Sequence, residues 1–155
     1  MKLCHKYLFF QALSDKTYLY VLDRNCTQFE PDHPSYIKIA HFVYDHINTH
    51  NDFEILYSTR HYGPMVFYLT MKKDIEKLLF HYFKKSNLKD AVELVKLYGL
   101  IHPYSKLAEE EDPIILIRKF ISNEAKNQTR LNIHLESVLE TMAKNKEVLN
   151  ELKDS

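Results

Sequence analysis

Apolar residues recur at three- and four-residue spacing through the second half of the chain, the pattern of amphipathic helices. Thr70, Ser86 and Asp112 stand where helix caps belong, and Pro113 suits a first helical position. Gly99 stands where a helix-ending glycine is expected. The pattern predicts helices over residues 71–85, 87–98, 113–126 and 129–152.

The last predicted helix has the most regular pattern. Its apolar positions alternate in steps of four and three, which makes a heptad seam with one polar position. This seam is typical of a helix that binds a partner or forms a homodimer, with the asparagine fixing the register. An ordinary amphipathic helix that closes its own domain is the alternative. The seam consists of Leu131, Leu135, Val138, Met142, Asn145, Leu149 and Leu152.

Short aromatic and β-branched runs dominate the first half of the chain and predict strands. The first two runs are joined by turn residues 14–16, and the last two by residues 60–64, so two hairpins are expected. The first run also fits a short helix, which leaves residues 3–13 open between strand and helix. A helix over residues 35–50, introduced by Pro34, separates the hairpins. The predicted strands cover residues 6–13, 17–22, 53–57 and 65–69.

This element order predicts an α+β fold. Residues 1–70 are expected to form an N-terminal antiparallel sheet of two hairpins with one packed helix, and residues 71–155 a C-terminal helical bundle. A chain of 155 residues is long enough to bury a core and is expected to be a single domain.

Glycine is scarce, with only Gly63 and Gly99 in the whole chain. Phosphate-cradling loops and dinucleotide turns depend on glycine, because it allows positive φ and close approach to a ligand. We therefore expect no cofactor and favour a binding protein over an enzyme. The same skew, with many lysines, asparagines and tyrosines and no tryptophan, is typical of an A/T-rich genome.

The formal net charge is zero, with 21 basic and 21 acidic residues, which argues against a sequence-independent nucleic-acid binder. Lysines are nevertheless concentrated around the helix of residues 71–85, interleaved with Phe80, Tyr82 and Phe83. Basic residues with aromatic neighbours can bind nucleic acid or an acidic surface, although a solvated lysine face with an aromatic core face on one amphipathic helix is the simpler interpretation. The lysines are Lys72, Lys73, Lys77, Lys84, Lys85 and Lys89.

Two of the nine histidines, His46 and His50, are four residues apart on a predicted helix. That spacing places both imidazoles on one face, where they could share a metal ion. Asp45, Asp52 and His61 are possible third ligands. A metal-assisted hydrolase using His46 and His50 is therefore an alternative function, and ordinary hydrogen-bonding histidines are the simpler interpretation.

Two cysteines, Cys4 and Cys26, are too few for a disulfide framework and indicate free thiols in a reducing compartment. We find neither a signal-peptide core nor a stretch long enough to span a membrane. The expected location is therefore cytoplasmic or otherwise intracellular.

Eleven tyrosines and nine phenylalanines give the chain many side chains of the kind enriched at interfaces. With no enzyme motif and a heptad seam, they favour a non-enzymatic interaction module. Its expected partner is another protein, bound through aromatic and amphipathic-helix surfaces. A nucleic-acid partner is the less favoured alternative.

Overall fold

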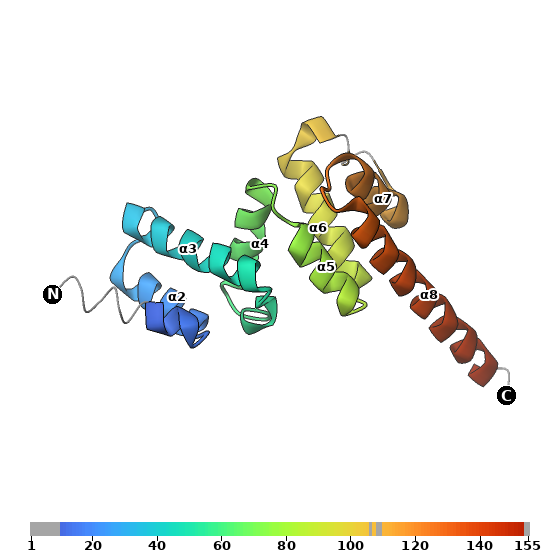
Figure 1. Ribbon diagram of the computed structural model, residues 1–155, viewed down its shortest axis with the longest axis horizontal. Helices are drawn as coiled ribbons and strands as arrows, with labels where there is room; N and C mark the ends of the chain where they lie inside the picture. Colours follow the sequence, from blue (N-terminus) through green and yellow to red (C-terminus); the bar gives the residue numbers. More distant parts are fainter. Residues whose placement is uncertain (1–9, 106, 108–109, 154–155) are drawn as a thin grey trace. The chain divides into compact units, whose positions relative to one another are not determined.

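The structure is a computed structural model that describes residues 10–105, 107 and 110–153, with side chains described up to Asn145. These residues form helices and connecting turns, and no strand occurs among them (Figure 1). The expected α+β fold is therefore wrong, and the fold is all-α. The chain divides into two compact units, Met1–Lys72 and Lys73–Ser155, each described by itself below. The expectation of a single domain stays a prediction.

Unit 1 is built around the long helix α3. Residues 10–14 are helical, α2 packs on α3, and α3 packs on α4. Residues from all these helices and from η1 fill one apolar core, in which Tyr18, Val43, Ile47, Phe53 and Leu69 are buried. The elements are α2 (Tyr18–Gln28), α3 (Pro34–His50), the 3₁₀ turn η1 (Phe53–Ile55) and α4 (Tyr62–Met71).

The two predicted hairpins are wrong because their apolar residues are buried at helical spacing. Residues 17–22 contribute to α2, where Tyr18, Val21 and Leu22 are buried together. Met65 and Leu69 are likewise buried four residues apart in α4. Residues 53–55 form a 3₁₀ turn that residues 56–58 continue as ordinary turns, residues 10–13 are helical, and residues 6–9 lie outside the described residues. Aromatic and β-branched residues favour strands only when they pack on a pleated sheet. In unit 1 these residues pack between helices instead.

The predicted helix over residues 35–50 is confirmed as α3. Pro34 is its first residue, and Nδ1 of His33 accepts a hydrogen bond from the backbone N–H of Ser35 at 3.0 Å. This contact satisfies one of the N–H groups that a helix start leaves unpaired. Asn51 ends the helix in the left-handed conformation, with φ 59°.

Unit 2 contains four α-helices and one 3₁₀ turn within its described residues. Helix α5 packs on α6 and α8, and α7 packs on α6 and α8. One oxygen of the Asp112 carboxylate accepts hydrogen bonds from the N–H groups of Ile114 and Ile115, so the expected cap of α7 is confirmed. The elements are α5 (Glu76–Lys84), α6 (Leu88–Ile101), η2 (Pro103–Ser105), α7 (Pro113–Asn123) and α8 (Gln128–Lys153).

Three other expected helix ends are wrong. Thr70 lies inside α4, where its hydroxyl donates to the carbonyl oxygen of Val66 at 2.8 Å. Asn87 rather than Ser86 caps α6, and its side chain accepts from the N–H of Asp90. Gly99 is a buried residue within α6, which continues to Ile101.

Neither glycine occupies a left-handed position. Gly63 lies in the first turn of α4, and a Cβ built there would meet nothing within 4 Å. Instead, five other described residues adopt left-handed backbone, which costs an ordinary L-residue about 1–2 kcal/mol. A glycine at such a position would relieve this strain. The left-handed residues in the described part of the chain are Lys16, Asn51, Ser58, Lys73 and Ser86.

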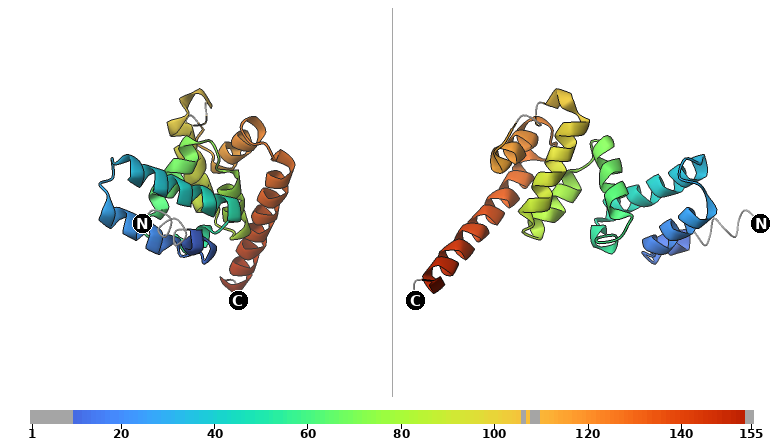
Figure 2. Two further views of the ribbon diagram at one scale, coloured as in Figure 1. Left: turned by 60° about the vertical axis from the view of Figure 1, so that its left-hand side comes forward. Right: turned by 180° about the vertical axis from the view of Figure 1, so that it is seen from behind.

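The buried seam residues of α8, among those whose side chains are described, lie in its first half. Leu131, Leu135 and Val138 are buried, whereas Met142 and Asn145 are exposed. The C-terminal half extends beyond α5 and α7, as both views in Figure 2 show. The first half of the seam therefore closes the core of unit 2.

Candidate interaction surface

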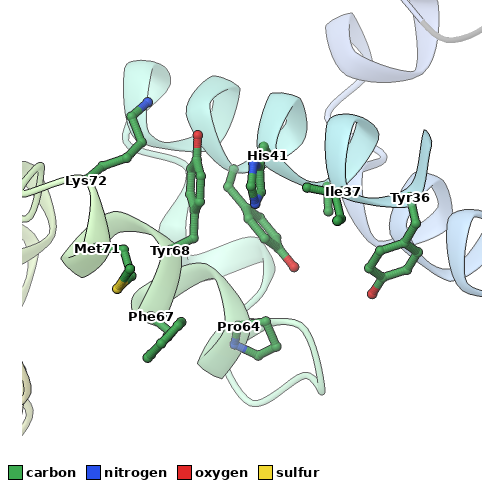
Figure 3. A pocket seen from close by; sticks show the side chains of 10 residues that line it. Tyr36, Ile37, His41, Pro64, Phe67, Tyr68, Met71 and Lys72 are labelled. Carbon is green, nitrogen blue, oxygen red and sulfur yellow. The ribbon is translucent and has the colours of Figure 1, made fainter. Parts of the chain in front are cut away.

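A groove of about 460 Å³ lies between α3 and α4 in unit 1 (Figure 3). The lining residues recur in alternating steps of one and three along each helix, so each helix presents one continuous face to the groove. The groove is lined by Tyr36, Ile37, Ala40, His41, Tyr44, Pro64, Phe67, Tyr68, Met71 and Lys72.

Apolar side chains dominate the open part of this groove. Ile37 is 40% exposed, Phe67 52% and Met71 53%. Figure 3 places Pro64, Phe67 and Met71 along α4, and Ile37 along α3. Adjoining apolar side chains left in water mark a surface that another molecule covers more often than scattered single residues do.

Tyr68 is fixed at one end of the groove by contacts on its ring and its hydroxyl. The ring stacks on His41 with centroids 4.1 Å apart, and the hydroxyl donates to the Asp45 carboxylate at 3.1 Å. Lys72 donates to the same carboxylate at 2.7 Å, with its ammonium 5.2 Å from the Tyr68 ring centroid. Burial raises the pKa of Tyr68, and the hydrogen bond to Asp45 raises the pKa of Lys72. Tyr68 therefore stays neutral and Lys72 charged at neutral pH.

The α4 wall of the groove was not expected from the sequence. Pro64, Phe67, Tyr68 and Met71 follow the helical spacing of three, one and three residues, and that spacing was the available signal. Treating residues 65–69 as a strand placed Phe67 on a different face from Tyr68. The aromatic exterior that was expected is present, but on helices.

His46 and His50 lie together on α3, with ring centroids 4.1 Å apart and planes at 25°. Nδ1 of His50 donates to the backbone carbonyl of His46 at 2.8 Å. The Tyr18 hydroxyl donates to Asp52 at 2.8 Å, so Nδ1 of His46, 3.1 Å away, donates to the same phenol oxygen. Both Nδ1 atoms are thus engaged within unit 1.

Burial, followed by the nearby His50, lowers the pKa of His46. Burial raises the pKa of Asp52, but the hydrogen bonds from Lys16 and Tyr18 outweigh it and leave that pKa below its usual value. Within the described residues, no three histidine, cysteine or acidic side chains are grouped so that they could hold a metal ion. The metal site at His46 and His50 stays a prediction, and the described residues supply no third ligand for it.

The expected lysine surface is divided between the units. Lys72 belongs to the groove of unit 1, whereas the other five lysines lie in unit 2 and are exposed. Lys84 places its ammonium 5.8 Å from the ring centroid of Phe80. Binding of nucleic acid or an acidic surface by these lysines stays a prediction. The lysines of unit 2 are Lys73, Lys77, Lys84, Lys85 and Lys89.

The seam of α8 is also divided. Leu131, Leu135 and Val138 are buried within unit 2 and are covered without a partner. Met142 and Asn145 are exposed, and the side chains of Leu149 and Leu152 lie outside the described part. Partner binding or dimerisation through this seam stays a prediction that concerns its second half.

The thiol of Cys26 is free and exposed, whereas Cys4 lies outside the described residues. Within the part of the chain that the structure describes, none of the helices has the length and apolar character needed to cross a membrane.

Comparison with known proteins gives a family match. The model of the mitochondrial 28S ribosomal protein S22 family matches residues 2–103 of this chain. The chain belongs to this family. The match includes α2, α3, α4, α5 and α6, so the α3–α4 groove lies inside it and α7 and α8 lie beyond it.

Relatives in two mammals agree with the family match. The chain is 36% identical over 125 residues to the small ribosomal subunit protein mS22 of Mus musculus, and 34% identical over 125 residues to that of Bos taurus. Each alignment covers 77% of this chain and 35% of the relative. The chain therefore spans about a third of the length of these S22 relatives.

Proposed function

We propose that this protein is a structural component of the small subunit of the mitochondrial ribosome, where it contacts ribosomal proteins and ribosomal RNA. Membership of the S22 family and the names of the mouse and bovine relatives support this proposal. The proposed location is the mitochondrion, which is narrower than the cytoplasmic or intracellular location expected from composition. The proposal includes contact with RNA, whereas the balanced net charge argued against a sequence-independent nucleic-acid binder.

Family membership carries the ribosomal role, and the α3–α4 groove is the surface that we assign to the contact with a ribosomal protein. Phe67 and Met71 are half-exposed, so burial of their remaining surface contributes about 0.8–1.5 kcal/mol each, half of the value for a fully exposed side chain. Tyr68 is already fixed by His41 and Asp45, so a partner meets an ordered wall and loses less entropy on binding. The groove thus suits an apolar segment of a neighbouring ribosomal protein.

The test of this role is sedimentation of the tagged full chain from host mitochondria through a density gradient. We expect the wild-type chain to migrate with the small subunit. Phe67→Asp is expected to move the chain toward the top of the gradient, because a carboxylate in the groove loses its water when the partner binds. Leu100→Asp is the matched control, since Leu100 is an apolar residue of α6, 72% exposed and outside the groove.

Two results would contradict the proposal at different points. A wild-type chain that never migrates with the small subunit refutes the ribosomal role. A Phe67→Asp chain that migrates like wild type and like Leu100→Asp refutes the groove as the protein contact, and leaves the ribosomal role standing.

The second half of the α8 seam, in which Met142 and Asn145 are exposed, is a second surface for a protein partner, and a homodimer is one form of that interaction. Met142 is the described apolar residue of the seam that is available for it. Light scattering over a range of concentrations tests the homodimer. A concentration-dependent dimer that Met142→Asp disrupts supports it, and a strict monomer rejects it.

A further inference from the structure

Cations surround one aromatic ring at the junction of α5 and α8 in unit 2. The guanidinium of Arg130 lies 4.2 Å from the ring centroid of Phe80, and the ammonium of Lys84 lies 5.8 Å from it. His134 meets the ring edge to face, with centroids 4.5 Å apart and planes at 87°. We call these four residues the Phe80 cluster.

The helix spacing explains why the four side chains meet. Phe80 and Lys84 are one turn apart on α5, and Arg130 and His134 are one turn apart on α8. One turn before Phe80, the carboxylate of Glu76 accepts hydrogen bonds from the backbone N–H groups of Lys126 and Asn127. These bonds tie the start of α8 to α5 and hold the Phe80 cluster in register.

The charges of the Phe80 cluster are not neutralised. Neither Lys84 nor Arg130 forms an ion pair with a carboxylate in the part of the chain that the structure describes, and both are exposed. Other cations of unit 2 are paired: Arg118 lies 2.7 Å from Glu136, and Lys96 lies 3.1 Å from Glu93. The Phe80 cluster is therefore an electropositive surface on a unit whose total charge is balanced.

The nearest carboxylate along α5 does not remove this charge. Glu76 receives its hydrogen bonds from the backbone of residues 126 and 127 and from the side-chain amide of Asn127, at 3.1 Å. It occupies the start of α8 itself, so an incoming anion has to bind at the side chains of Arg130 and Lys84 rather than at the helix terminus.

We propose that the Phe80 cluster is an RNA-binding site, with Arg130 and Lys84 contacting backbone phosphates. A guanidinium beside an aromatic ring is held in one orientation, and its planar N–H fork matches a phosphate. A nucleobase can also stack on the outer face of such a guanidinium. An acidic protein surface has no nucleobase, so this contact favours RNA as the ligand. The inference rests on the proposed function, since the RNA is taken to be ribosomal. Arg130 and His134 lie beyond the family match, so the site is inferred from this chain alone.

The test is fluorescence anisotropy of the full chain with a short fluorescein-labelled oligouridylate at several salt concentrations. In the double variant Lys84→Gln with Arg130→Gln, we expect the Kd for the RNA to rise about tenfold or more. The slope of log Kd against log salt should fall by about 1.4, since each lost phosphate contact removes about 0.7 for single strands. Unchanged circular dichroism spectra show that the variants are folded.

Two further variants separate a specific site from general charge. Lys96→Gln with Arg118→Gln removes two exposed cations that are already paired, and is expected to leave the Kd unchanged. Arg130→Lys keeps the charge but loses the planar fork, so it should keep the salt slope and weaken binding.

Equal RNA binding by the wild type and the Lys84–Arg130 double variant would overturn the inference, as would an equal loss in the Lys96–Arg118 control. A wild-type chain that binds anionic lipid vesicles but no RNA would also overturn it. The ribosomal role is judged separately, because co-sedimentation with the small subunit does not depend on binding of the oligouridylate.

Discussion

Replacing Leu135 by alanine tests whether the seam of α8 closes the core of unit 2. Leu135 is 0% exposed, whereas Met142 on the same seam is 37% exposed. A fully buried Leu→Ala substitution costs about 2–5 kcal/mol, because it removes buried carbon atoms and leaves a cavity. We expect a loss of about 3 kcal/mol for Leu135→Ala, which is a large share of a typical domain's free energy of unfolding. Met142→Ala should change stability by less than about 0.5 kcal/mol.

The assay is urea denaturation followed by far-UV circular dichroism, with the transitions of the two compact units fitted separately. Hydrogen exchange of the α8 amides identifies the transition that belongs to unit 2. A loss below about 1 kcal/mol for Leu135→Ala, or equal losses for both variants, would refute the packing argument. The whole seam would then be free for a partner, as the heptad pattern also allowed.

Three further predictions concern local features. Ser86→Gly relieves a φ of 53° and should raise the melting temperature of unit 2 by about 2–4 °C, whereas no rise would show that the turn is unstrained. Since burial and His50 lower the pKa of His46, the unfolded chain binds this proton more readily. The stability that unprotonated His46 allows is therefore complete above about pH 6.5 and is lost as the pH falls further. In thermal melts, the melting temperature of His46→Gln should depend less on pH over that range. Because the described residues place no group of three possible ligands around His46 and His50, we expect a chelator to leave the melting temperature unchanged; a drop would revive the metal site.

Helical periodicity was the part of the sequence that predicted structure well. Helix α3 was expected over residues 35–50 and is found at Pro34–His50, and α8 was expected over 129–152 and is found at Gln128–Lys153. Both are long enough to repeat the apolar spacing several times, and Pro34 marks the first residue of α3.

Short aromatic runs were the part that could not be assigned. Met65-Val66-Phe67-Tyr68-Leu69 is equally apolar on every face, so periodicity within five residues does not separate a strand from a helix. Its neighbours decide the outcome: Met65 and Leu69 are buried in unit 1, while Phe67 is left exposed.

The Phe80 cluster shows a related limit. Lys84 and Phe80 were singled out as neighbours in one helix, but the contribution of Arg130 and His134 depends on α5 meeting α8 some fifty residues later. Sequence spacing contains no signal for such a contact. The α3–α4 groove depends on two helices in the same way.

The most direct test of the ribosomal role is sequencing of the RNA that copurifies with the tagged full chain from host mitochondria. The account predicts enrichment of small-subunit ribosomal RNA over large-subunit ribosomal RNA, together with small-subunit proteins. Recovery of the chain with neither ribosomal RNA, or with both in the proportion found in total mitochondrial RNA, would contradict it.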